Sequence, residues 1–331
     1  MTSTQSGTLQ RVTRENAMKF LIGPGMEPVL TVDPGERFVL ETEDALAGKI
    51  RSEDQLPIPE QVPELAVTPA ELNPVAGPIQ VRGAKRGDAL AVTIEAIDVD
   101  PQGMTCVIPG VGPLNDSFSF PDCRGPFTRI IRHEPGPSGT MRDGRGHLDD
   151  SVSWDLQPFI GTIGTTPDRE TEASLVGQGA WGGNMDCREI KPGHTLLLPC
   201  FHDDALLFVG DVHGSQADTE FYGIADETRA DVTLSCDIRP GMKLANPRVE
   251  TGHSIICVYS YRPLEDAVQG AMLDLFRMMV NEYGVPEREA YMHLCINPEV
   301  RVHVFQMIAV GRIQYTVGAE IPTKFLDMYG S

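Results

Sequence analysis

Short apolar runs, many of them rich in valine, isoleucine and threonine, alternate with glycine- and proline-containing segments along most of the chain. Such runs are typical of β-strands, and the 33 glycines and 26 prolines are more than a helical protein of this length tolerates. A four-residue turn with glycine in third place recurs before such runs, at residues 33–36, 85–88 and 191–194, with a fourth copy at 239–242. Because glycine accepts the positive φ that a type II turn requires there, each copy can direct the chain into a strand.

Only the C-terminal part carries a helical pattern. Apolar residues recur at three- and four-residue spacing from Leu264 to Met279, which places them on one face of a helix that ends by Gly284. A second helix is predicted from Pro286 to Leu294, followed by strands at 300–305 and 313–317. We therefore predict an α+β fold that is predominantly β, with a β-sandwich or barrel-like core and the C-terminal helix pair packed on one side. We expect a single unit over residues 1–331, with two packed lobes, 1–155 and 156–331, as the alternative.

Two stretches lack apolar periodicity. Residues 51–74 alternate proline with acidic and amide side chains and are predicted to form an ordered surface loop over the core. Residues 115–150 are predicted to form a second long loop. Long loops inside compact domains are often functional, so the second is either a lid or substrate wall, or a mobile surface excursion.

The charge of the chain excludes some classes of function. With 47 acidic against 27 basic residues, the formal net charge is −20, which repels phosphate backbones and anionic membranes. The 41% hydrophobic content is that of a globular protein, no run of eighteen apolar residues occurs, and residues 1–7 lack the layout of a signal peptide. We therefore expect a cytoplasmic protein without nucleic acid or membrane partners.

The seven cysteines are odd in number, scattered and never arranged as CxxC. This argues against a disulfide framework and against a structural zinc knot. Most are expected to be small buried residues, and whether Cys187 is an exception is left open.

Acidic side chains are concentrated in residues 201–231, which contain eight of them against one basic residue. The apolar run at 205–210 in this segment is typical of a buried strand, and it leads straight into Asp211 and His213. Carboxylates and an imidazole at the end of a buried strand are unfavourable unless they are paired or bind a metal. Residues two apart share a strand face, which groups Asp211 with His213.

The same spacing groups Asp218 with Glu220, and Asn184 with Asp186. If residues 214–217 form a hairpin connection, the groups at 211/213 and 218/220 face each other. Two or three carboxylates around one histidine suit a divalent ion such as Zn²⁺ or Mn²⁺, which would lower the pKa of bound water and polarise a carbonyl oxygen. An ion-paired surface turn is the alternative.

Other catalytic arrangements match less well. There is no GxSxG elbow, no GxGxxG between a strand and a helix, and no pattern of the Ser-Ser-Lys amidases, so covalent catalysis is disfavoured. A cupin would supply a second histidine where this chain has Asp211. Gly161, Gly164 and Gly183 lie in glycine-dense segments whose backbone N–H groups could approach an oxyanion, and tight turns explain them equally well.

A series of motifs in order along most of the chain resembles the acetamidase/formamidase family of amide hydrolases. It includes Gly-Gly-Asn-Met-Asp at 182–186 and Gly-Asp-Val-His-Gly-Ser-Gln at 210–216, with further segments at 29–36, 41–45, 73–79, 158–164, 198–199, 223–228 and 289–292. The resemblance implies metal-dependent, non-serine hydrolysis of short carboxamides, or of cyclic amides in some branches, on a β-rich fold. The family's polar residues correspond here to Asn184, Asp186, Asp211, His213, Gln216, Asp218, Glu220 and Glu227.

The chain departs from the family in three places. Trp181 stands where members often have histidine, residues 17–24 lack an expected segment with histidine and tryptophan, and residues 297–299 replace a Gly-Asp pair. Because such positions affect the choice of substrate, the expectation includes a bulkier or cyclic amide.

Residues and resemblance together predict a hydrolase that cleaves the C–N bond of a small neutral carboxamide, lactam or imide to an acid and ammonia or an amine. The predicted cofactor is a divalent metal, Zn²⁺ in the first place and Mn²⁺ or Ca²⁺ otherwise. Its predicted ligands are Asp186, Asp211, His213 and Glu220. The predicted proton carriers are Glu227 and Glu220. The predicted oxyanion and substrate contacts are Asn184, Gly161, Gly164, Gly183, Gln216 and Trp181.

The alternatives are a non-catalytic module that binds a metal or an amine, and a cupin-like metal oxidase. By analogy, a homodimer or higher homo-oligomer is expected, with the helix pair as its surface.

Overall fold

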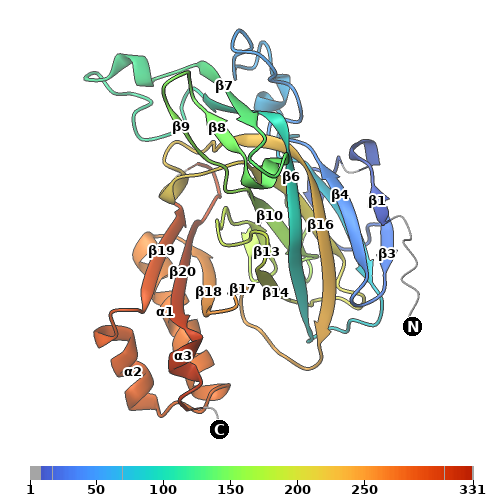
Figure 1. The fold of residues 1–331 in the computed structure, drawn as a ribbon, viewed down its shortest axis with the longest axis vertical. Coiled ribbons are helices and arrows are strands. Elements are labelled where there is room, and N and C mark those ends of the chain that lie inside the picture. The colour runs from blue at the N-terminus through green and yellow to red at the C-terminus, as the bar shows by residue number, and fades with distance from the viewer. Residues whose placement is uncertain (1–8, 17, 69, 309, 330–331) are drawn as a thin grey trace.

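The computed structural model describes residues 9–16, 18–68, 70–308 and 310–329. The prediction about a signal peptide at residues 1–7 lies outside them. In the described chain, eighteen strands join one hydrogen-bonded, curled sheet, and β2 and β11 form a separate pair (Figure 1). The strands are β1 (Gln10–Val12), β2 (Leu21–Ile22), β3 (Leu30–Val32), β4 (Arg37–Thr42), β5 (Val75–Val81), β6 (Ala89–Val107), β7 (Phe127–Glu134), β8 (Arg145–His147), β9 (Ser153–Asp155), β10 (Phe159–Thr165), β11 (Glu172–Ala173), β12 (Gln178–Gly179), β13 (Gly182–Asn184), β14 (Thr195–Pro199), β15 (Leu207–His213), β16 (Glu227–Arg239), β17 (Arg248–Glu250), β18 (Ser254–Tyr261), β19 (Arg301–Gln306) and β20 (Tyr315–Pro322).

The long strands β6 and β16 run antiparallel along the middle of the sheet. β4 also pairs with β16, β5 pairs with β15, and β14 pairs with β6, so strands from both sides of residue 155 are direct neighbours. The strand pairs of the described chain are antiparallel except β1 with β4 and β3 with β5. The division into two lobes stays a prediction, but the two halves of the chain share one hydrogen-bonded ladder.

The helices gather at one end of the molecule (Figure 1). They are α1 (Leu264–Asn281), α2 (Glu287–Ile296) and the short α3 (Thr323–Leu326), with five 3₁₀ turns elsewhere, η1 (Arg14–Asn16), η2 (Pro63–Ala66), η3 (Pro121–Cys123), η4 (Met141–Asp143) and η5 (Asp218–Glu220). The predicted face of α1, including Ala267, Ala271 and Leu275, packs in one buried apolar cluster with residues of β18 and β20. The prediction of a mainly β fold with a C-terminal helix pair on one side is confirmed.

The glycine turns are also as predicted. Gly35, Gly87, Gly193 and Gly241 have φ values of 78°, 93°, 88° and 70°, which glycine adopts at little cost. The first three lead directly into β4, β6 and β14. The fourth does not enter a strand, because β17 begins only at Arg248.

The prediction of a long loop at residues 115–150 was wrong in part. This stretch contains β7 and β8, which continue from β6 as an antiparallel meander that β9 completes. The alternation of buried and exposed residues along β7 is regular, but the flanking turn segments obscured it in the sequence. The described residues 51–68 and 70–74 do form a loop around the short η2, and its apolar members Val62 and Leu72 pack in a small buried cluster with β6 residues.

No helix among the described residues is long and apolar enough to cross a membrane. All seven cysteines are free, and five are buried. Burial raises the pKa of the Cys187 thiol, so this cysteine is a protonated core residue rather than a nucleophile.

The expected homo-oligomer stays a prediction. The helix α2, on the expected surface, exposes Tyr291 and Ile296 to 73% and 74%.

Candidate functional site

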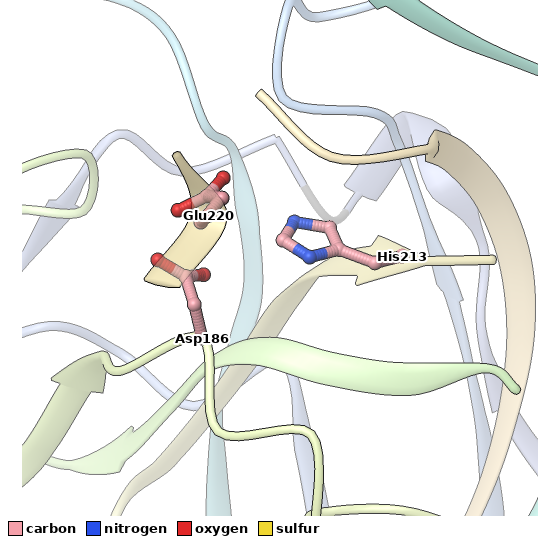
Figure 2. A group of neighbouring side chains, drawn as sticks. All are labelled: Asp186, His213 and Glu220. Atoms are coloured by element: carbon pink, nitrogen blue, oxygen red, sulfur yellow. The ribbon is translucent and has the colours of Figure 1, made fainter. Parts of the chain in front are cut away.

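Four carboxylates converge on one imidazole where β10, β13, β15 and β16 meet. Asp211 and His213 come from the end of β15, Glu227 opens β16 directly opposite His213, Asp186 follows β13, and Glu220 ends the turn η5. All five residues are at most 8% exposed. Figure 2 shows Asp186, Glu220 and His213 directed toward one shared space from three separate segments.

The backbone around this cluster is unusual. Nine non-glycine residues of the described chain have a positive φ, and four of them belong to the cluster or touch it: Asn73 (56°), Asp186 (47°), Asp211 (57°) and Glu220 (47°). Asparagine and aspartate tolerate this conformation better than other residues, but glutamate does not. Such conformations have a free-energy cost of about 1–3 kcal/mol each and persist where the surroundings fix them, which is typical of functional sites.

His213 lies at the centre of the cluster. Its Nε2 atom is 3.4 Å from Asp211 Oδ1 and 3.3 Å from Glu227 Oε2. Candidate ligand atoms fall into two overlapping groups, Asp186/His213/Glu220 and Asp211/His213/Glu227, and within each group they lie within 4.8 Å of one another. The edge of the Phe159 ring packs against the imidazole, with ring centroids 4.9 Å apart.

Gln216 fixes the orientation of this imidazole. Its Nε2 donates to the backbone carbonyls of Asp186 (3.2 Å) and Phe305 (3.1 Å), so its Oε1 is the atom that faces His213. His213 Nδ1 is 2.9 Å from that oxygen and must therefore carry a proton to donate. The other nitrogen, Nε2, is left facing the carboxylates.

Further polar residues hold the carboxylates, and the sequence reasoning missed them. Asn73 Nδ2 and Thr162 Oγ1 donate to Asp211 Oδ2 at 3.2 and 3.1 Å. Gln306, at the end of β19, donates to Asp186 Oδ2. Asn73 and Thr162 belong to segments that carry the family resemblance, which was an available signal, whereas nothing in the sequence around Gln306 pointed to the site.

Burial dominates the electrostatics of the cluster. It raises the pKa of Asp186 to about 6, with a further contribution from the Asp211 carboxylate, and it raises the pKa of Glu227 to about 7. Burial and the Asp186 carboxylate raise the pKa of Glu220 well above its usual range. Burial opposes the charge of Asp211 as well, but His213 and the donors at Oδ2 lower its pKa. Burial and mutual repulsion therefore disfavour the charged forms of Asp186, Glu220 and Glu227, and a cation bound among them would favour these forms.

Several buried acceptor atoms in the cluster have no hydrogen-bond partner. Among the described residues, Asp186 Oδ1 and the neighbouring Asn73 Oδ1 have none, and Glu227 Oε2 has only the ion-pair contact with His213 Nε2 at 3.3 Å. Buried carboxylate oxygens are unfavourable unless a hydrogen bond or a cation compensates them. The set consists of oxygen atoms and one imidazole nitrogen, a composition that fits a divalent cation.

The predicted oxyanion and substrate residues lie in different places. A Cβ atom on Gly161 would come within 2.7 Å of both Asp186 Oδ1 and Asp211 Oδ2, so this glycine makes room for the carboxylates. A Cβ on Gly164 or Gly183 would instead meet the indole of Trp181, which is buried in a satellite apolar cluster. Asn184 donates to the Leu175 carbonyl, and its Oδ1 lies 3.1 Å from Thr162 Oγ1, so it contacts β10 from β13.

The sequence-based grouping of Asp218 with Glu220 was wrong. The two residues lie in the turn η5, where Thr219 has a φ of 76°, and not on a strand. Asp218 is exposed and lies 3.5 Å from Arg188, while Glu220 turns into the cluster. The connection from β15 to β16 spans residues 214–226, so residues 214–217 are not a hairpin turn.

A second buried ion pair closes the base of this connection. His133 Nε2 lies 3.0 Å from Asp226 Oδ2, and His133 Nδ1 donates to the Asp100 carbonyl at 2.7 Å. Asp226 is also tied through its backbone to Gly214 and Ser215. The pair therefore anchors the segment that carries Gln216 and Glu220.

Replacing His133 by asparagine is expected to destabilise the fold by about 3–5 kcal/mol at pH 6, because Asp226 is left buried without its partner. Burial alone would lower the pKa of His133, but Asp226 and Asp100 raise it above 6.5. A group with a raised folded pKa stabilises fully below the unfolded pKa, and this contribution is lost as the pH rises through the folded value. The loss on substitution should therefore be larger at pH 6 than at pH 9 in urea unfolding. An equal loss at both pH values would contradict the charged pair, and His253→Asn, at an exposed histidine, is the control.

Comparisons with known proteins agree with the motifs. An acetamidase of Mycolicibacterium smegmatis is 26% identical over 250 residues, which cover 60% of this chain and 59% of that protein. This chain thus aligns with less than two thirds of the length of such curated relatives. Solved acetamidases from Bacillus halodurans (TM-score 0.85, 27% identity, 97% of this chain and 100% of that one) and Yersinia enterocolitica (0.84, 31%, 98% and 94%) share the fold. The model of the acetamidase/formamidase family matches residues 10–179 and 169–328, and the chain belongs to this family.

Proposed function

We propose that this protein hydrolyses the C–N bond of a carboxamide to a carboxylic acid and ammonia or an amine, with a divalent cation as its cofactor. The observation that carries the proposal is the buried cluster of four carboxylates around His213, in which Asp186 Oδ1 has no hydrogen-bond partner among the described residues. Membership of the acetamidase/formamidase family and the names of the relatives support the reaction class.

Asp186, Asp211, His213 and Glu227 would hold the cation. A bound divalent ion supplies a water of lowered pKa and polarises the amide carbonyl. The sequence-based prediction made Glu220 a ligand, and Glu227 or Glu220 the proton carrier. The present assignment makes Glu227 the ligand and Glu220 the proton carrier. The reason is that Glu220 lines the open cleft beside the site, whereas Glu227 is 2% exposed and lies 3.3 Å from His213 Nε2.

The chain's own residues prepare the reaction. Gln216 holds the His213 ring so that Nε2 faces the carboxylates, and Gln306 and Thr162 orient Asp186 and Asp211. Glu220, between the cluster and the cleft, takes a proton from the attacking water and passes it to the departing nitrogen. The buried setting keeps bulk water away and strengthens each of these interactions.

Purified protein is expected to contain a divalent cation and to hydrolyse at least one member of a panel of formamide, acetamide, lactams and imides. Elemental analysis gives the metal, and ammonia release or ring opening gives the activity. Removing the metal with a chelator should abolish turnover, and adding back Zn²⁺, Mn²⁺ or Ca²⁺ separately should identify the ion that restores it.

The same experiment, with oxygen consumption as an additional measurement, separates the alternatives. A tightly bound metal without hydrolysis of any amide indicates a binding module. Oxygen consumption in the presence of Fe²⁺ indicates cupin-like oxidation. Full amide hydrolysis by metal-free protein would refute the role of the cation.

A further inference from the structure

A cleft of about 680 Å³ opens beside the carboxylate cluster. Glu220 and Gln216 line it, so it is continuous with the proposed reaction centre. Its apolar walls come from separate segments: Leu148 and Trp154 from the meander of β7 to β9, Phe221, Tyr222 and Ile224 from the connection 214–226, and Ile131 from β7.

Two of the aromatic walls are held in place. Trp154 Nε1 donates to Ser215 Oγ at 2.8 Å, and its indole packs over Gly146, where a Cβ atom would lie 3.1 Å from Nε1. The Tyr222 hydroxyl is 2.6 Å from Thr105 Oγ1. Phe221, directly after Glu220, is 52% exposed. Rigid aromatic surface beside a reaction centre favours a flat apolar group.

The charged side chains around the cleft offer little to a charged substrate. Arg188 lies 3.5 Å from Asp218, and Lys191 lies 2.9 Å from Glu189. Asp155 and Asp226 are paired in the same way with Arg145 and His133. Each of these charged side chains has an oppositely charged partner. The remaining acidic residue of the lining, Glu220, is directed to the carboxylate cluster.

The size of the cleft exceeds what a formyl or acetyl group needs. Cavities of about 300–1,000 Å³ hold ligands of drug size, whereas acetamide has only a methyl group beyond its amide. A small amide would leave most of the apolar wall in contact with water. A larger acyl group would bury this wall, and the burial favours binding in proportion to the apolar area.

We infer that the cleft is an acyl-binding site and that the preferred substrates are primary carboxamides with an uncharged aromatic acyl group, of the kind of phenylacetamide. The inference rests on the proposed function and specifies its substrate class. In the reaction, the oxygen of water forms the new C–O bond and one proton of that water passes to the amide nitrogen. The C–N bond breaks, and the nitrogen leaves as ammonia. Trp154 and Phe221 are the specificity-determining residues.

The test compares phenylacetamide with acetamide by ammonia release from the metal-loaded protein. The wild type is expected to show at least about tenfold higher kcat/KM for phenylacetamide. Trp154→Ala should lower this value about tenfold or more, mainly through KM, and lower that for acetamide by a smaller factor, so that the preference for phenylacetamide falls. Trp154→Phe should restore most of the loss, because a ring is again present.

Two further variants secure the result. Phe221→Ala, at a half-exposed position that does not endanger folding, should reduce the preference for phenylacetamide in the same direction. Phe118→Ala, at an aromatic residue that is 92% exposed and outside the cleft, should change neither substrate's kcat/KM. Equal or better turnover of acetamide overturns the inference and leaves amide hydrolysis standing. Hydrolysis of neither amide, nor of any other in the panel, overturns the proposed function and the inference with it.

Discussion

A His213→Ala variant is expected to lose the bound cation and about 10³-fold or more of the amide hydrolysis. His213 is the member common to both candidate ligand groups, and it is the nitrogen donor in each. The several kcal/mol of charge stabilisation that a catalytic metal supplies correspond to about three powers of ten in rate. Elemental analysis and kcat/KM for the best amide of the panel measure the two losses together.

The substitution also affects stability. Asp211 and Glu227 would lose the imidazole that lies 3.3–3.4 Å from both. Removing one partner of a buried ion pair destabilises by about 3–5 kcal/mol, so circular dichroism must confirm that the variant is folded. If His213→Ala does not fold, His213→Gln is the second choice, because glutamine fills more of the volume that the imidazole occupies. His253→Ala, at an exposed histidine, should keep both metal and turnover, and a folded His213→Ala protein that keeps both would refute the site.

The sequence was informative about the site wherever local periodicity decides the geometry. β15 is a run of seven buried residues, and the spacing of two brings Asp211 and His213 together at its end although Asp211 has a positive φ. Glu227 also meets His213, because it opens the next strand of an antiparallel pair. The helix α1 could be predicted for the same reason, since a buried face at helical spacing leaves a strong pattern.

The sequence failed where the geometry depends on irregular backbone or on distant strands. Strand spacing cannot apply to residues 218–220, because η5 turns Glu220 inward and leaves Asp218 in solvent. Gln306 reaches Asp186 across 120 residues, from the C-terminal strand β19, whose own histidine, His303, pairs with Glu320 rather than with the site. The roles expected of Gly164 and Gly183 rested on composition alone, and both glycines face Trp181.

Glu220→Gln is expected to keep the bound cation and the fold but to lower kcat by about 10²–10⁴-fold, the usual contribution of a general acid or base. Glu220 lines the cleft, and it lies on the connection 214–226 rather than on a strand of the core. Glutamine has nearly the same shape and can still form hydrogen bonds, but it cannot accept a proton from water. Steady-state kinetics with elemental analysis of the same sample separates loss of proton transfer from loss of metal.

Asp218→Asn is the matched control, because it makes the same chemical change two residues away at an exposed side chain that lies 3.5 Å from Arg188. Its kcat should stay within about twofold of the wild type, as expected for a surface ion pair. If Glu220→Gln loses the cation together with its activity, Glu220 belongs to the ligand set with Asp186 and His213, with which it forms one of the two groups of neighbouring ligand atoms. If it retains full activity, another group must carry the proton. Both outcomes differ from the expected one, in which the metal content is unchanged and turnover falls. Loss of a proton carrier lowers turnover without lowering the metal content.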